Sequence, residues 1–238
     1  IADVWRFPDA LPSRVSLDPW TANWPGTRSL LAVTVAVALL ATLVATAITL
    51  ACLENESRTG RAPGARVLSL LYLPIVVPQV SFLFGLQVLM LAAGFGPSLA
   101  AVAFAHLIFV LPYVLLSLGD TWRSLDPRYG EIAAALGASD ARIFGRVRLP
   151  LLLPAILTAA AVGFAVSVGL YLPTALIGAG RIMTVTTEAV ALSAGGARRL
   201  IGVAAVLQML LPLLAFSLAL AVPALAFRNR RGLRSARP

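Results

Sequence analysis

A few polar side chains interrupt long uncharged stretches of this sequence, and they are the first candidates for chemistry. Serine and histidine can form a nucleophile and its base in a hydrolase, but no G-x-S-x-G pattern surrounds Ser167. A metal site needs several ligands, and His106 is the single histidine, with no carboxylate nearby in the sequence. We therefore predict no catalytic residue, no metal site and no bound cofactor, and we interpret His106 as a hydrogen-bonded packing residue.

Charged residues gather instead in the segment EIAAALGASDARIFGRVRLP, residues 131–150, which holds five of them between uncharged stretches. Asp126 and Pro127, just before this segment, are typical of a helix start. Gly137 favours a left-handed helix end, and Ser139 is suited to cap a second short helix that extends through Val147. The pattern predicts a helix–turn–helix that fits a cleft on a partner; the alternative is an interfacial loop whose arginines contact lipid headgroups.

The elements that must hold these residues are helices that cross a membrane. The 238 residues are 59% hydrophobic and 12% charged, which is about half the charge of a soluble domain. A helix of roughly 20 apolar residues crosses a ~30 Å hydrocarbon core, and each uncharged stretch is longer than that. The sequence predicts an all-α integral membrane protein with about five transmembrane helices, at residues 29–53, 67–92, 98–119, 150–175 and 200–227.

The distribution of arginine predicts the orientation of these helices, because cytoplasmic loops carry more positive charge. Thirteen arginines fall in residues 54–66, 120–148 and 228–238, and six fall in the other set of loops. We predict an extracytoplasmic N-terminal segment (1–28), a transmembrane domain (29–227) with a cytoplasmic loop (120–150), and a basic cytoplasmic tail (228–238). An exported start with no visible export signal also predicts a further helix upstream of Ile1.

The spacing within 131–150 resembles that of a known family. The pattern begins with Glu131, which is followed by Ala133 two residues later and by Gly137 six residues later. An aliphatic-x-Leu-Pro run, formed by Val147, Leu149 and Pro150, then ends thirteen residues after the glycine. This pattern resembles the EAA loop of ABC importer permeases, the binding-protein-dependent transport system inner membrane component family. Ile132 and Val147 depart from the family's Ala and Ile but stay apolar. The likeness runs from about residue 15 onward and is greatest to the C-terminal half of fused permeases of the iron, thiamine and YnjC types.

The resemblance implies the core of a six-helix permease half in the bacterial plasma membrane that binds no ATP itself. Its partners would be a dimer of cytoplasmic ATP-binding subunits, a second permease half, fused or separate, and an extracytoplasmic solute-binding protein, with no nucleic acid. In agreement, the sequence has no G-x-x-x-x-G-K-[ST] phosphate loop. The resemblance implies that the ATPase docks on the EAA loop through Glu131, Ala133, Ala134, Gly137, Val147, Leu149 and Pro150.

Polar side chains within a membrane span are costly in lipid, so they are candidates to line a solute pathway. These candidates are Gln79, Gln87, Ser167, Tyr171 and Thr174. A stripe of small residues permits close helix approach, either to a second permease half or within this chain; it consists of Ala155, Ala159, Gly163 and Ser167. A secondary transporter or channel subunit is the alternative function, but such proteins usually carry charges or repeats in their spans. The sequence does not define the solute.

Overall fold

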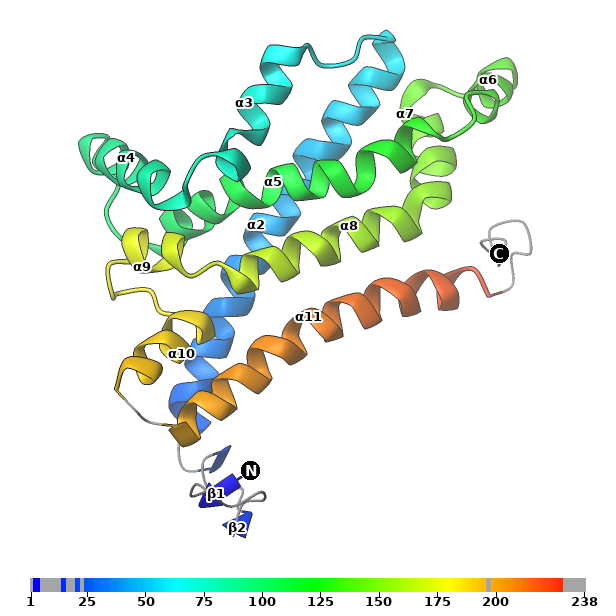
Figure 1. Ribbon diagram of the computed structural model, residues 1–238. Coiled ribbons are helices and arrows are strands. Elements are labelled where there is room, and N and C mark those ends of the chain that lie inside the picture. The colour runs from blue at the N-terminus through cyan, green and yellow to red at the C-terminus, as the bar shows by residue number, and fades with distance from the viewer. Residues whose placement is uncertain (1, 5–13, 16–19, 22–23, 196–197, 229–238) are drawn as a thin grey trace.

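Long helices packed side by side form most of the protein in the computed structural model, which describes residues 2–4, 14–15, 20–21, 24–195 and 198–228 (Figure 1). The four longest are α2 (Trp24–Thr59), α5 (Leu99–Arg123), α8 (Leu149–Gly169) and α11 (Arg198–Ala226). Two short strands, β1 (Ala2–Val4) and β2 (Arg14–Val15), pair antiparallel near the N-terminus. Most of the predicted N-terminal segment (1–28) and, apart from Arg228, the predicted basic tail (228–238) lie outside the described residues.

Four of the described helical segments are long and apolar enough to cross a membrane, and a bent pair makes a fifth. That pair consists of α3 (Ala65–Val76) and α4 (Gln79–Ala92), which meet at an angle of 108°. The prediction of an all-α membrane protein with about five spans is therefore confirmed. The predicted helix at 67–92 is not continuous, however, because α3 ends at Val76 and α4 begins at Gln79.

The break between α3 and α4 has a local cause. Proline lacks the backbone N–H that an uninterrupted helix needs, and it pushes the preceding residue into an extended conformation. Val77 before Pro78 has φ −78° and ψ 140°, which ends α3, and α4 begins one residue after the proline. Proline alone does not force such a bend, since Pro112 lies inside the continuous helix α5.

The predicted span at 150–175 ends earlier than expected, at Gly169, because Leu170 is extended with φ −72° and ψ 109°. Two shorter helices follow, α9 (Leu172–Gly178) and α10 (Val185–Ala194). Polar contacts hold α10 to the long helices: Val185 N donates to Thr34 Oγ1 on α2 at 2.9 Å, and Thr186 Oγ1 donates to the Val168 carbonyl on α8 at 2.5 Å.

The apolar core lies between α2, α5 and α8. Near the α6 and α7 end of the bundle it consists mainly of side chains of these three helices, including Leu53, Val114, Leu118 and Ile156. Toward the other end α4 and α9 join it, through residues such as Leu86 and Ile177. The helix α11 is attached along α8, where Leu211 and Ala215 pack against Phe164 and Val168. Most large side chains of α11 face outward.

Candidate functional site

The charged segment forms a helix–turn–helix at one end of the bundle (Figure 1), made of α6 (Arg128–Ala135) and α7 (Asp140–Ile143). Asp126 Oδ1 accepts a hydrogen bond of 2.9 Å from the backbone N–H of Arg128, so this carboxylate gives the first residue of α6 a partner for its N–H group. Gly137 has φ +80°, the left-handed conformation that glycine adopts without strain. The chain therefore turns at the glycine that the sequence singled out.

The second arm of this element differs from the prediction. A separate short helix was expected to extend through Val147, but α7 passes directly into a five-residue π-helix, η1 (Phe144–Arg148), and then into α8. Residues 140–169 form one helical segment of 30 residues. The helical backbone therefore runs from α7 into α8 without a break.

An apolar face of α6 is left uncovered by the rest of the described chain. Tyr129, Ile132 and Leu136, spaced three and four residues apart, share this face and are 51%, 61% and 83% exposed. No side chain of α6 is buried. A short exposed helix with large apolar side chains, beside charged residues, has the character of a protein interaction surface.

The seven predicted docking residues divide into two groups. Glu131, Ala134 and Gly137 are exposed on and after α6, while Ala133 is half-buried beside them. Val147, Leu149 and Pro150 are half-buried where η1 meets α8, and Leu149 packs against the core. The structure thus presents the first part of the motif to the outside and uses the last part to join the element to the bundle.

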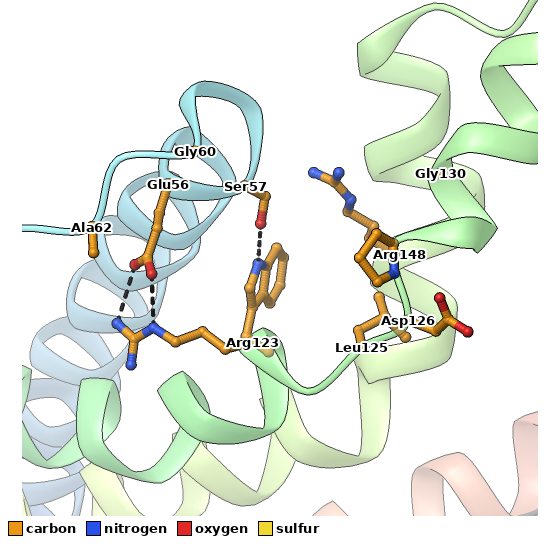
Figure 2. Close-up of a pocket in the computed structure, with 11 residues that line it drawn as sticks. Glu56, Ser57, Gly60, Ala62, Arg123, Leu125, Asp126, Gly130 and Arg148 are labelled. Carbon is orange, nitrogen blue, oxygen red and sulfur yellow. Dashed lines mark hydrogen bonds and ion pairs between the residues drawn. The ribbon is translucent and has the colours of Figure 1, made fainter.

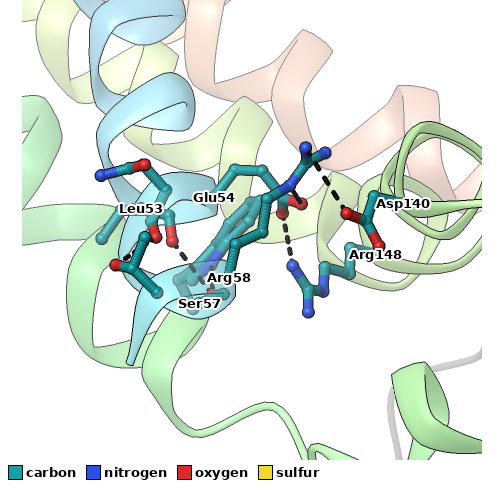
Figure 3. Close-up of polar contacts among 9 residues, drawn as sticks. Leu53, Glu54, Ser57, Arg58, Asp140 and Arg148 are labelled. Carbon is teal, nitrogen blue, oxygen red and sulfur yellow. Dashed lines mark hydrogen bonds and ion pairs between the residues drawn. The ribbon is translucent and has the colours of Figure 1, made fainter. Parts of the chain in front are cut away.

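Ion pairs tie this element to the end of α2 (Figure 3). The carboxylate of Glu54 accepts a 2.7 Å bond from Arg58 Nε and a 2.6 Å bond from Arg148 Nη1. Arg58 also lies 4.0 Å from Asp140 Oδ2, the first residue of α7. Sequence reasoning missed these contacts, although Glu54 directly follows an uncharged stretch.

A cavity of about 310 Å³ lies between the ends of α2 and α5 and the start of α6 (Figure 2). On one side Arg123 donates two hydrogen bonds to Glu56, of 2.8 and 3.1 Å, and Trp122 Nε1 donates to Ser57 Oγ at 3.0 Å. Arg148 lines the same cavity from η1. These bonds fix α5 to α2 next to the loop.

The polar candidates within the spans are brought together only in part. His106 is 1% exposed, and its two ring nitrogens lie 2.8 Å from Ser167 Oγ and 2.8 Å from Thr174 Oγ1. The interpretation of His106 as a hydrogen-bonded packing residue is confirmed. Gln87 instead donates to the carbonyl of Leu176 at 3.2 Å, linking α4 to α9. Gln79 and Tyr171 are half-buried at other positions.

The described residues contain no group of three or more His, Cys, Asp or Glu side chains close enough to hold a metal ion. The described fold combines a bundle of spanning helices with an exposed apolar face on α6 and, behind that face, the ion pairs of Glu54 with Arg58 and Arg148. This is the architecture of a multi-pass membrane protein. The profile of the family described as "Binding-protein-dependent transport system inner membrane component" matches residues 44–231. The chain belongs to this family of ABC transporter permeases of the inner membrane.

Relatives with established names agree with this family. The chain is 43% identical over 164 residues to the inner membrane ABC transporter permease protein YnjC of Escherichia coli, covering 69% of the chain and 32% of that protein. It is 34% identical over 153 residues to the molybdenum transport system permease protein ModB of Mycobacterium bovis, covering 60% and 58%. It is 31% identical over 130 residues to the spermidine/putrescine transport system permease protein PotC of Haemophilus influenzae, covering 55% and 49%. The chain thus spans about a third to three fifths of these relatives.

Proposed function

We propose that this chain forms part of the solute pathway of an ATP-driven importer and is driven by a separate cytoplasmic ATPase that docks on the loop around α6. The observation that carries the proposal is the uncovered apolar face of Tyr129, Ile132 and Leu136 at the arginine-rich end of the bundle. Large apolar side chains at the centre of an interface, with charged residues around them, supply most of the binding free energy in protein complexes. The proposed docking residues are Glu131, Ala133, Ala134, Gly137, Val147, Leu149 and Pro150.

The charge distribution supports a cytoplasmic location for this docking surface. Arg58, Arg123 and Arg148 lie at the same end as α6, where Arg58 and Arg148 share Glu54 and Arg123 pairs with Glu56. Arginine-rich ends of membrane helices face the cytoplasm, where ATP is available. We therefore propose that the C-terminal end of α11 is cytoplasmic and that α10 lies on the outer side, where a solute-binding protein delivers its solute. A second permease half completes the pathway.

We propose that the solute pathway is lined by some of the polar candidates, which fall into two groups. They are Gln79, Gln87, Ser167, Tyr171 and Thr174. Ser167 and Thr174 are both hydrogen-bonded to His106, so in this conformation their role is to hold α5, α8 and α9 together. Gln79, Gln87 and Tyr171 are half-buried and are the better candidates for direct solute contact. The named relatives transport molybdenum and spermidine or putrescine, which are chemically unlike, so we propose no solute.

The docking proposal is tested by copurification. The chain is expressed together with its ATPase and its second permease half, and the complex is purified by a tag on this chain. Ile132→Asp and Leu136→Asp place a charge on the apolar face, so we expect each to reduce the amount of copurified ATPase by at least tenfold, since desolvating a charge in an apolar interface costs more than about 1.4 kcal/mol.

A matched control places the same charge elsewhere at the same end of the bundle. Ala62 is exposed in the turn between α2 and α3, and Ala62→Asp should leave copurification unchanged. If all three variants retain the ATPase as the unaltered chain does, the ATPase does not dock on α6 and the proposal is wrong.

A further inference from the structure

Glu54 is a buried carboxylate that two arginines share at the end of the membrane-spanning part of α2. The residue is 8% exposed, and its two oxygens accept one bond each, from Arg58 Nε and from Arg148 Nη1. A buried charge is stable only when opposite charges and hydrogen bonds replace the water that it has lost. Both guanidinium groups are therefore needed to hold this carboxylate in its position.

The three charges belong to segments that are far apart in the sequence. Glu54 and Arg58 are on α2, whereas Arg148 is the last residue of η1, 94 positions after Glu54. Arg58 extends the link to α7 through Asp140 (Figure 3). The end of α2 is thus connected by charge to both ends of the α7–η1 segment.

Covalent continuity already joins α7 to α8, but no peptide bond joins this segment to α2. Apolar contacts also exist here: Phe144 of η1 packs against the core cluster that contains Leu53 of α2, and its ring centroid lies 6.4 Å from that of Trp122 of α5, with the rings inclined at 44°. Apolar contacts are non-directional and permit sliding, whereas a charge-assisted hydrogen bond fixes both distance and direction. The Glu54–Arg148 bond is the directional link between η1 and α2.

We propose that Glu54 is a positioning residue that makes the end of α2 and the α7–η1 segment move as one unit when the ATPase acts on the loop. The inference rests on the proposed docking of an ATPase at α6. The docking face receives the displacement, continuous backbone passes it to α8, and the Glu54–Arg148 bond passes it to α2. Because Arg123 binds Glu56 on the same turn of α2, α5 follows α2.

The experiment measures whether α2 and α7 keep a fixed separation. Cys52 is the single cysteine of the sequence and is exposed on α2, and Ala141, exposed on α7, is replaced by cysteine. Nitroxide labels on both positions are measured by electron paramagnetic resonance in the complete transporter, with partner subunits that lack cysteine. Spectra are recorded without nucleotide and with Mg-ATP and vanadate. The solute does not have to be identified for this measurement.

When Glu54 and Arg148 are both unchanged, we expect the distance between the two labels to be the same with and without Mg-ATP and vanadate. Glu54→Gln and Arg148→Gln should each make the mean distance shift on addition of Mg-ATP and vanadate. The double variant should shift no more than either single variant, because both remove the same bond. Arg148→Lys keeps the charge and should restore the fixed distance.

The matched control is Glu56→Gln, which removes a carboxylate from the same end of α2 but not from the link to η1. It should leave the distance fixed. The inference is wrong if Glu54→Gln and Arg148→Gln leave the distance fixed, or if the distance shifts with the charges unaltered. Failure of the docking proposal is seen separately, as loss of the ATPase from the unaltered complex or its retention by Ile132→Asp and Leu136→Asp.

Discussion

Gly163 on α8 lies so close to Val114 on α5 that a Cβ atom at position 163 would be 2.7 Å from Val114 Cγ2. The same atom would lie 3.1 Å from Val110 Cγ1 and 3.4 Å from Thr42 Cγ2 on α2. The absence of a side chain at this one position therefore sets how closely three spanning helices approach. The small-residue stripe on α8 is used for packing within the chain here, which is one of the two roles that the sequence left open.

Gly163→Ala should destabilise the bundle. The β-branched valines have few alternative rotamers, so the backbones must move apart, and overpacking of this kind costs about 1–3 kcal/mol. We expect a lower midpoint of thermal unfolding for the purified protein in detergent. Gly202→Ala is the control, because an added Cβ on α11 meets no atom within 4 Å. Equal midpoints for Gly163→Ala and the unaltered protein would contradict this reading of the helix contacts.

His106→Leu should also destabilise the protein, for a different reason. It removes the partner of the buried Ser167 hydroxyl and leaves the buried Thr174 hydroxyl with only its 3.4 Å bond to the Leu170 carbonyl. Leaving a buried polar group without a partner costs about 1–3 kcal/mol. Replacing the hydroxyls as well, in His106→Leu with Ser167→Ala and Thr174→Val, should recover part of the loss, since an apolar cluster has no unsatisfied group. Thermal unfolding of the single and triple variants measures this difference. A triple variant less stable than His106→Leu would show that the hydrogen bonds are not the cause.

The sequence predicted those features that depend on local composition. Uncharged stretches gave the membrane helices, because length and apolarity alone decide whether a helix can span. Gly137 gave the turn in the helix–turn–helix, because a left-handed residue favours glycine. The break at Pro78 was within reach of the same reasoning, but Pro74, Pro112 and Pro212 lie inside helices of this protein, so proline by itself does not locate a bend.

Contacts between distant segments were out of reach of a single sequence. Ser167 and Thr174 are 61 and 68 positions from His106, and no periodicity within one helix indicates which face meets which partner. The pairing of Glu54 with Arg148 depends likewise on how α2 crosses α8. The two residues stand out only as charges that border uncharged stretches, which marks the membrane boundary but not the partner.

Gly137→Ala should weaken ATPase docking more than it weakens the fold. A non-glycine residue in the left-handed conformation costs about 1–2 kcal/mol, and position 137 is exposed, with no atom within 4 Å of an added Cβ. The strain is therefore relieved by reorienting α6, which disturbs the apolar face. Asparagine tolerates this conformation better, so Gly137→Asn should retain more copurified ATPase than Gly137→Ala. The midpoint of thermal unfolding should change little in both variants. The opposite order of the two substitutions would show that the left-handed turn does not position α6.

The orientation of the protein is tested by the accessibility of introduced cysteines in a Cys52→Ala background. Ala62 in the turn after α2 and Ala138 after α6 are at the arginine-rich end, and Ser193 on α10 is exposed at the other end. Because cytoplasmic loops carry the excess of arginine, a membrane-impermeant maleimide added to intact cells should label Ser193→Cys alone. Ala62→Cys and Ala138→Cys should react only after the membrane is opened. Labelling in detergent is the control that shows that each thiol is reactive. Labelling of Ala138→Cys from outside would place α6 away from ATP, and no cytoplasmic ATPase could then drive this chain through it.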